Sequence, residues 1–324
     1  MISVVIPVRN ASATLEICLS AVCGSKYENF EVIVVDDHCS DGSAEIAGRY
    51  QVNVISLTPH KGASAARNAG ARAAGGDVLF FIDADCVVAP DTLQRVASAF
   101  REHPGEVIGG TYTPIPYDKG FFSTFQSIYI NHSETHAEKP DYIATHAMAI
   151  GRELFWERSG GFREDFMPIL EDVELSHRLR DSGMRLVMRP EIEVSHIFNF
   201  TFMRSIKNAF RKSRYWVRYS LGRGDMAADS GTASRGLKAM AACTTFSLAL
   251  FMLGLFTGNI LILLLPPLPF LFGMILNAGI IEAFFRHGGP LFGLMAVPYY
   301  TLIYPLAAAA GGIAGLVDRL RGVK

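Results

Sequence analysis

The chain of 324 residues has few cysteines, and no two of them lie close together in the sequence in a metal-binding or redox motif. Its five cysteines are scattered, and no two stand in C-x-x-C spacing. The odd number and this spacing argue against a zinc knuckle and against a disulfide framework. We therefore expect a reducing, cytosolic environment for the part of the chain that carries most of them.

The sequence also lacks several targeting and binding signals. Its first apolar run, residues 2–6, is too short for a signal peptide and has no basic segment before it, so we expect a β-strand there. The formal net charge of −1 excludes no class of partner by itself. No RNA- or DNA-binding motif is present, so no nucleic-acid partner is expected.

Charge is scarce in residues 237–317, which hold only three charged side chains. Prolines interrupt this region, so kinked or re-entrant shapes are compatible with it. We expect a transmembrane region over residues 237–324 with two or three spans. The apolar stretches that are long enough to approach a bilayer core of roughly 30 Å lie at residues 239–257, 259–281 and 291–317.

A basic and aromatic segment, residues 200–223, comes before the transmembrane region. Its mixture of Arg and Lys with Phe, Tyr and Trp is typical of an amphipathic helix on a membrane surface; a solvated basic helix is the alternative. With the small, polar linker that follows, it forms an expected interfacial segment over residues 200–236. Basic residues before a span favour a cytoplasmic location for the N-terminal part of the chain.

Apolar runs alternate with helical patterns in the N-terminal part of the chain. This alternation is typical of an α/β fold with a mostly parallel, Rossmann-like sheet and flanking helices. The aromatic-rich residues 121–130 are expected to form a helix, either in a core or against the membrane. We expect strands at residues 2–6, 32–35, 52–56, 78–82, 142–150, 185–189 and 192–197.

The strand at residues 78–82 ends at two carboxylates, Asp83 and Asp85, separated by one residue. Ionising both at the end of an apolar strand is costly unless a cation lies between them. Mg²⁺ or Mn²⁺ would supply that charge, and Mg²⁺ is often bound by one or two carboxylates together with substrate phosphates. The alternative for an isolated D-x-D triplet is a solvated loop. Asp36 and Asp37 end another strand, so both pairs are expected to face one crevice at the carboxyl ends of the strands.

Six motifs follow one another over about the first 200 residues, at residues 3–10, 30–43, 60–70, 81–85, 160–162 and 171–179. Together, and in this order, they resemble glycosyltransferase family 2, the inverting enzymes with a GT-A fold. The resemblance implies a catalytic domain over residues 1–199 that transfers a single sugar from a nucleotide-diphosphate sugar. It also implies a lipid-linked or cell-envelope acceptor and an integral membrane protein with a cytoplasmic catalytic domain, and it leaves a homo-oligomer open.

The resemblance also assigns residues to the donor site. Asp37 would hydrogen-bond the nucleotide base, a role that suits a carboxylate acceptor, while Asp36 is the alternative turn residue. Arg67 could equally cap or brace a helix. The positions that the resemblance implies around the donor nucleotide are Pro7, Val8, Arg9, Asp37, Lys61, Arg67, Asn68 and Asp83.

The catalytic and metal roles follow from the same resemblance. Asp172 matches the base that removes a proton from the acceptor hydroxyl, and Glu171 would orient the acceptor or the base. Asp85, assisted by Asp83, would hold a divalent Mg²⁺ or Mn²⁺ ion that neutralises the leaving diphosphate. His196 would complete the metal shell; a structural histidine is the alternative.

Three rival functions are weighed against this interpretation. Processive polysaccharide synthases carry a Q-x-x-R-W motif, but residues 212–216 lack the Gln and have Tyr215 inserted, which favours single transfer. A nucleotidyltransferase would need a phosphate loop that the sequence does not contain. A non-catalytic membrane scaffold would retain the fold without turnover of a nucleotide-sugar.

Overall fold

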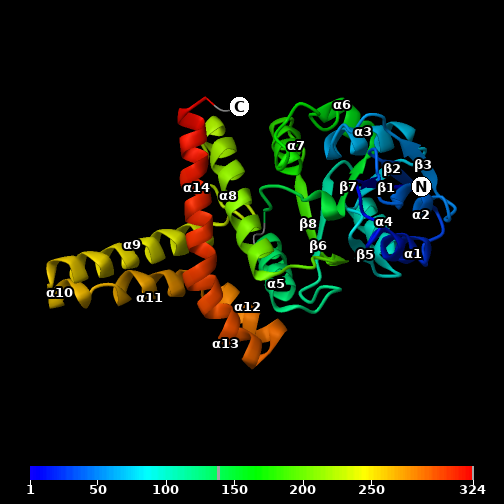
Figure 1. Cartoon of the computed structure of the whole chain (residues 1–324). Coiled ribbons are helices and arrows are strands. Elements are labelled where there is room, and N and C mark those ends of the chain that lie inside the picture. The colour runs from blue at the N-terminus through cyan, green and yellow to red at the C-terminus, as the bar shows by residue number, and fades with distance from the viewer. Residues whose placement is uncertain (137–138, 323–324) are drawn as a thin grey trace. The chain divides into compact units, whose positions relative to one another are not determined.

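The computed structural model describes residues 1–136 and 139–322, and the chain forms two compact units (Figure 1). The first unit comprises Met1–Asp118 and Glu134–Phe198. The second comprises Lys119–Ser133 and the chain from Asn199 onward. The second unit therefore includes a segment from within the N-terminal 199 residues as well as the apolar C-terminal part.

In the described part of the chain, the first unit is built on one eight-stranded sheet with the order β3-β2-β1-β4-β7-β6-β8-β5. The β3-β2-β1-β4 half is parallel, which confirms the Rossmann-like α/β fold, whereas β7 runs antiparallel to both β4 and β6. The sheet is therefore mixed. The strands are β1 (Ile2–Val8), β2 (Phe30–Asp36), β3 (Asn53–Ser56), β4 (Val78–Phe81), β5 (Cys86–Val88), β6 (Val107–Tyr112), β7 (Met148–Gly151) and β8 (Leu186–His196).

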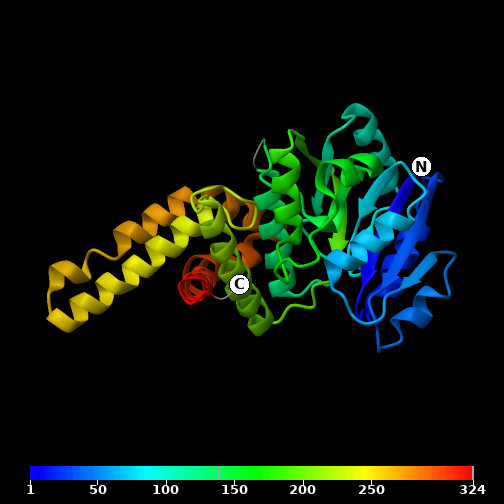
Figure 2. The same cartoon turned by 90° about the horizontal axis from the view of Figure 1, so that it is seen from above.

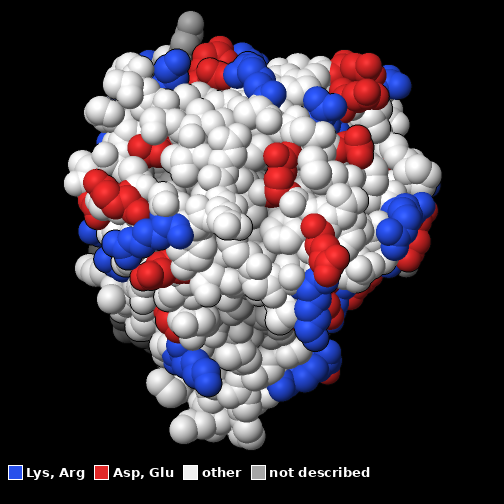
Figure 3. All heavy atoms as spheres, turned by 90° about the vertical axis from the view of Figure 1, so that its right-hand side faces the viewer, with Lys and Arg blue, Asp and Glu red and all other residues white. Residues whose placement is uncertain are grey.

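Helices flank this sheet (Figure 2). The central strands β1 and β4 are almost continuously apolar because helices cover both faces of a parallel sheet. Acidic and basic side chains are interspersed on the face of the molecule seen in Figure 3. The helices of the first unit are α1 (Leu15–Cys23), α2 (Ser43–Ala47), α3 (Ala63–Ala73), α4 (Thr92–Glu102), α6 (Arg152–Ser159) and α7 (Glu171–Asp181), with a 3₁₀ turn η1 (Thr145–Ala147).

Helix α3 lies unusually close to the sheet at Gly70. A Cβ atom at this position would lie well inside van der Waals distance of Val5 Cγ1 and 3.1 Å from Val35 Cγ2. Only glycine allows the helix backbone to approach β1 and β2 this closely. This approach fixes the height of α3 above the strand ends, where the site described below is found.

The region expected to hold two strands, residues 185–189 and 192–197, forms the single strand β8. Its pairing with β6 changes register between Gly109 and Thr111, so the strand continues through an irregularity. A Cβ at Gly110 would collide with the carbonyl oxygen of Ile192, which explains why a glycine faces this irregular part of β8. The expectation of two separate strands was therefore wrong.

The second unit is helical. Two of its helical stretches, Arg235–Thr257 and Pro290–Leu320, are long and apolar enough to cross a membrane. The stretches Ile260–Leu276 and Ala278–Gly288 qualify together but meet at a bend of 65°, as in a broken span or a re-entrant loop. The elements are α5 (Phe121–Thr135), α8 (Phe202–Arg223), α9 (Arg235–Thr257), α10 (Ile260–Leu263), α11 (Pro267–Leu276), α12 (Ala278–Gly288), α13 (Pro290–Pro298), the π-helical turn η2 (Tyr299–Ile303) and α14 (Tyr304–Leu320).

Phe125 of α5 lies in an aromatic core of this unit. Its ring centroid is 5.1 Å from that of Phe284, 4.7 Å from that of Tyr299 and 5.2 Å from that of Tyr304. The aromatic segment around residues 121–130 is therefore a core helix of the second unit. This resolves the alternative that the sequence left open.

The basic helix α8 packs along α14, and the two lie side by side in Figure 1. The packing is close because Cβ atoms at Gly311 and Gly315 would collide with backbone oxygens of α8. Arg214 donates to both carboxylate oxygens of Asp318, at 2.6 and 2.9 Å, and Arg218 lies 3.9 Å from the same group. One side of the expected interfacial helix is thus occupied by protein. Its exposed basic residues include Arg204, Lys207 and Arg211.

Candidate active site

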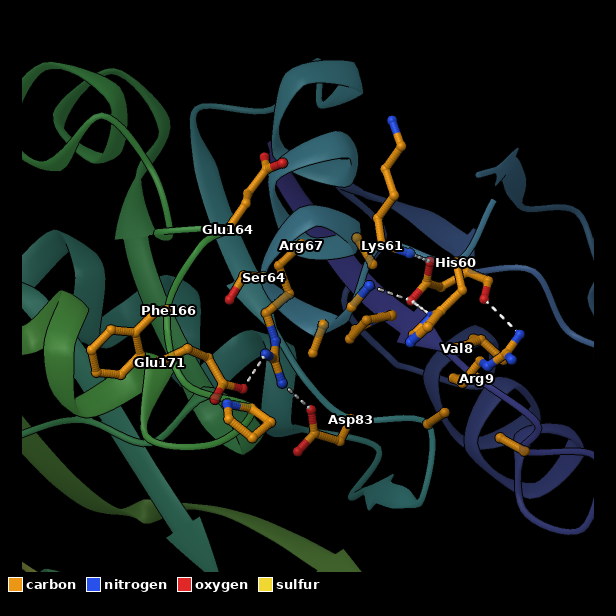
Figure 4. A pocket seen from close by; sticks show the side chains of 18 of the residues that line it. Val8, Arg9, His60, Lys61, Ser64, Arg67, Asp83, Glu164, Phe166 and Glu171 are labelled. Carbon is orange, nitrogen blue, oxygen red and sulfur yellow. Dashed lines mark hydrogen bonds and ion pairs between the residues drawn. The ribbon is translucent and has the colours of Figure 1, made fainter. Parts of the chain in front are cut away.

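A pocket of about 590 Å³ opens at the carboxyl ends of β1, β2 and β4 (Figure 4). These parallel strands end at Val8, Asp36 and Phe81, and the N-terminal turn of α3 closes the pocket beside them. This is the edge where open α/β sheets bind ligands. Residues that line the pocket include Pro7, Val8, Arg9, Asp37, His60, Lys61, Gly62, Ser64, Arg67, Asp83, Asp85, Glu164, Phe166 and Glu171.

Arg67 is buried in the wall of this pocket and lies between two acidic side chains (Figure 4). Its Nη2 donates to Asp83 Oδ1 at 2.7 Å and its Nη1 donates to Glu171 Oε1 at 2.8 Å. Burial lowers the pKa of Arg67, but the two carboxylates outweigh burial and raise that pKa above its ordinary value. Burial likewise opposes ionisation of Asp83, yet the Arg67 guanidinium holds the pKa of Asp83 below its ordinary value. This charged network ties together α3, the loop after β4 and α7.

Asp85 lies beside His196, with its Oδ1 3.3 Å from His196 Nε2. Strand pairing explains this neighbourhood, because β5 and β8 are antiparallel with Cys86 opposite His196. Burial and the Asp83 carboxylate raise the pKa of Asp85 to about 7. The ligand atoms of Asp85, Cys86 and His196 all lie within 4.8 Å of one another. Burial also raises the pKa of the Cys86 thiol well above its ordinary value, so the carboxylate and the imidazole are the better ligands.

Asp37 is also buried, and its carboxylate holds the loop that precedes α3. It accepts hydrogen bonds from the backbone N–H groups of Lys61, at 2.7 Å, and Gly62, at 2.8 Å, and it lies 2.6 Å from His60 Nδ1. Arg9 Nη1 donates to the carbonyl oxygen of Asp37 at 3.0 Å. The predicted base-contacting group therefore makes several contacts within the protein, and these contacts shape the wall of the pocket.

The other acid of this pair, Asp36, forms a turn. Its Oδ1 accepts a hydrogen bond from the backbone N–H of Cys39, three residues further along the chain, at 2.8 Å. This matches the turn role that the sequence left as an alternative. Lys61 is exposed, and its ammonium group extends away from Arg67 and Asp83 in Figure 4.

The two acids that begin α7 differ in position. Glu171 lines the pocket, whereas Asp172 is absent from its described lining and accepts a hydrogen bond from the N–H of Val173 at 2.9 Å. Both lie in the first helical turn, where the helix dipole favours a negatively charged side chain.

Asn68, one of the predicted donor-site residues, is also absent from the described pocket lining. Its amide nitrogen donates to the carbonyl oxygen of Phe162 at 2.8 Å and to Glu164 at 2.9 Å, and its oxygen accepts from the N–H of Phe162 at 2.8 Å. These bonds hold the turn at Gly160 and Gly161 against α3. In this structure the amide of Asn68 serves that turn.

Two side chains near Asp83 and Asp85, those of Tyr112 and His146, were not predicted from the sequence. His146 stacks on Tyr112 with ring centroids 3.8 Å apart, and Tyr112 meets His196 edge-on at 4.8 Å. The charge of His146 also helps to lower the pKa of Asp83, although less than Arg67 does. No motif in the sequence pointed to either residue, because they reach the site only through the pairing of β6 with β7 and β8.

Comparison with known proteins identifies a family for residues 3–159 of this chain. Residues 3–159 match the family model described as glycosyl transferase family 2. The chain carries a glycosyltransferase family 2 domain. The first part of the expected catalytic domain is thereby confirmed as belonging to this family.

Several curated relatives are similar to the family 2 domain. The glycosyltransferase AglE of Haloferax volcanii is 33% identical over 116 residues, which are 34% of this chain and 38% of that protein. A dolichol-phosphate mannosyltransferase of Pyrococcus furiosus is 33% identical over 116 residues, 34% of this chain and 33% of that protein. An undecaprenyl-phosphate 4-deoxy-4-formamido-L-arabinose transferase of Aeromonas hydrophila is 35% identical over 134 residues, 38% of this chain and 40% of that protein. The matched part thus spans two fifths or less of the length of these relatives.

Among solved structures, the mannosyltransferase PcManGT from Pyrobaculum calidifontis shares the fold. Its structure, in complex with GDP-Man and Mn²⁺, aligns with a TM-score of 0.60 over 100% of this chain and 88% of that chain. The sequence identity is 18%, so the likeness concerns the fold.

Proposed function

We propose that the chain is a membrane-associated, inverting glycosyltransferase that moves one sugar from a nucleotide-diphosphate sugar to a lipid-linked acceptor at the cytoplasmic membrane face. The family 2 domain supports the reaction class. The names of two relatives, a dolichol-phosphate mannosyltransferase and an undecaprenyl-phosphate transferase, support a polyprenyl-phosphate type of acceptor. Two helical stretches apolar enough to span a membrane, with the basic helix α8 before them, support the membrane location and its cytoplasmic side.

The observation that carries the proposal is the charged pocket at the strand ends. Its walls combine the carboxylates of Asp83 and Asp85 with the N-terminal turn of α3, which Gly62 and Ser64 line. A helix N-terminus is the positive end of the helix dipole and favours phosphate oxygens. A pocket with this turn on one side and metal-binding carboxylates on another suits a diphosphate group better than a neutral ligand.

The residues present fit a divalent cation. Asp85 Oδ1 is a buried carboxylate oxygen that accepts no hydrogen bond within residues 1–136 and 139–322, and His196 Nε2 lies 3.3 Å from it as an ion-pair neighbour. An oxygen and an imidazole nitrogen together suit Mn²⁺, while Mg²⁺ prefers oxygen ligands. Asp85 and His196 would hold the ion, with Asp83 beside them, and a bound ion would neutralise charge on the leaving nucleoside diphosphate.

Asp172 is the proposed general base. The N-terminal dipole of α7 favours its ionised form, so it can accept the proton of the acceptor hydroxyl as that oxygen attacks the anomeric carbon. Attack from the face opposite the leaving group inverts the configuration. Glu171 remains the neighbour that orients this part of the site, through its bond to Arg67.

A donor screen with the full chain in detergent tests the proposal. Nucleotide-sugars would be offered with Mn²⁺ and a short-chain polyprenyl phosphate, and the released nucleoside diphosphate and the glycolipid would be measured. We expect one donor to yield both products in a one-to-one ratio. A chain that binds nucleoside diphosphate but never forms a glycolipid would favour the scaffold alternative, and several sugars added per acceptor would favour the processive one.

A further inference from the structure

Arg67 connects the two acidic motifs of the pocket. Its guanidinium bonds Asp83, which follows β4, and Glu171, which begins α7, although the two acids are far apart in the sequence. The Arg67 side chain is only 5% exposed, so water competes little for these bonds. Such a buried, charge-assisted pair of bonds fixes both partners.

The same bonds leave Arg67 poorly placed to bind the nucleotide-sugar donor. Its Nη1 and Nη2 each donate to a carboxylate, and its buried Nε has no hydrogen-bond partner among the described residues. The ring of Phe162 lies 5.7 Å from the guanidinium carbon. Two of the five N–H groups of Arg67 bond these carboxylates, and the side chain is buried, so a movement of the guanidinium toward a diphosphate would break a bond to a carboxylate and leave that carboxylate without its partner. Such a loss is strongly unfavourable in a buried site.

We propose that Arg67 is a positioning residue of the transferase and does not bind the donor diphosphate. It holds Glu171, and with it the first turn of α7, against the loop that carries Asp83. It also bonds Asp83, so that Asp85 is the carboxylate of this motif that remains for a cation. The inference rests on the proposed function, in which Asp172 in this first turn is the base.

The proposal predicts a specific pattern of kinetic effects. Removal of the guanidinium would release Glu171 and allow the first turn of α7 to move, which displaces Asp172 from the acceptor. A misplacement of about 1 Å costs about 10²-fold in rate, so kcat should fall while donor binding is preserved. Direct contact of Arg67 with the diphosphate would instead weaken donor binding.

A double-mutant cycle separates these possibilities. Arg67→Met, Glu171→Gln and the double variant would be prepared as full-length protein, with Arg101→Met on the exposed side of α4 as the matched control. We expect each single variant to lower kcat by about 10- to 100-fold, with the Kd for nucleoside diphosphate within about threefold of the parent. The double variant should be no worse than the worse single variant, because the two groups act as one unit.

Arg67→Lys keeps the positive charge but lacks the planar guanidinium that bonds two carboxylates at once. Compared with Arg67→Met, it should therefore recover more of the parent's stability than of the parent's kcat. It also replaces Arg67→Met in the cycle if that variant does not fold. A loss of about tenfold or more in nucleoside diphosphate affinity, or kcat losses that multiply in the double variant, would overturn the inference. If the parent binds nucleoside diphosphate but transfers no sugar, the proposed function fails, and the binding measurements still decide whether Arg67 contacts the diphosphate.

Discussion

Replacing Gly70 by alanine tests whether the close approach of α3 to the sheet sets the geometry of the site. The new methyl group would fall well inside van der Waals distance of Val5 Cγ1 and 3.1 Å from Val35 Cγ2. Carbon atoms pack best at about 3.5–4.0 Å, so either the valines or the helix must move by about 1 Å. Val5 is fully buried in β1 and has little freedom to move.

Two opposing effects decide the change in the free energy of unfolding. Alanine in a helix interior is favoured over glycine by about 1 kcal/mol, whereas overpacking a core costs about 1–3 kcal/mol. The net loss should be no more than about 2 kcal/mol, or a few degrees in the unfolding midpoint. The effect on turnover should be larger. Arg67 lies one helical turn before Gly70, and a shift of about 1 Å in a site costs about 10²-fold in rate.

The assay compares unfolding midpoint and donor turnover of Gly70→Ala with those of Gly222→Ala. Gly222 lies in α8, and a Cβ there would meet nothing within 4 Å, so this control has the gain in helix propensity without the collision. We expect parent-like turnover for the control and a loss of about 10²-fold for Gly70→Ala. Equal stability and equal turnover in both variants would refute the argument that this spacing positions Arg67.

Further predictions concern three acids of the chain. Asp172→Asn should lower turnover by about 10²- to 10⁴-fold with little change in donor affinity; near-parent turnover would move the base elsewhere. Asp85→Ala should abolish Mn²⁺-dependent donor binding in calorimetry. The pKa of Asp85 is raised to about 7, and a cation binds the deprotonated carboxylate. The affinity of the parent protein for Mn²⁺ should therefore rise from about pH 5 to about pH 7 and then level off. An affinity that does not change with pH would contradict this prediction. Asp318→Asn removes the ionised partner of both Arg214 and Arg218, whereas Arg214→Gln removes only one of the two contacts. Because Arg218 is the more buried of the two arginines, Asp318→Asn should lower the unfolding midpoint more than Arg214→Gln does. Equal midpoints of the two variants would show that the Arg218 contact contributes little to stability.

Features that depend on local hydrophobic pattern could be predicted from the sequence. The apolar runs of β1 and β4 and the long apolar stretches of the second unit were found because a buried strand or a membrane-length helix has a direct compositional signature. The continuity of β8 was missed for the same reason. Arg189, Pro190 and Glu191 interrupt its apolar pattern, and only the irregular pairing with Gly110 of β6 shows that the strand continues.

The contents of the pocket were only partly predictable. Strand-end acids and the N-terminal turn of α3 lie where the open-sheet rule predicts. The sequence could not show that the amide of Asn68 bonds Phe162 and Glu164. It also could not show that the carboxylate of Asp37 accepts hydrogen bonds from the loop before α3. These choices depend on which backbone groups come within hydrogen-bond distance after folding.

The pairing of the acids gives a physical reason for two carboxylates in each acidic motif. Ionising adjacent acids in a partly buried pocket is unfavourable without cations. Arg67 donates a hydrogen bond to one acid of each motif, to Asp83 in the first and to Glu171 in the second. These two bonds join α3, the loop after β4 and α7. The second acid of each motif, Asp85 beside His196 and Asp172 in the first turn of α7, makes no described bond to Arg67. This division fits the proposed function, in which the first acid of each pair bonds Arg67 and the second serves the cation or the acceptor proton.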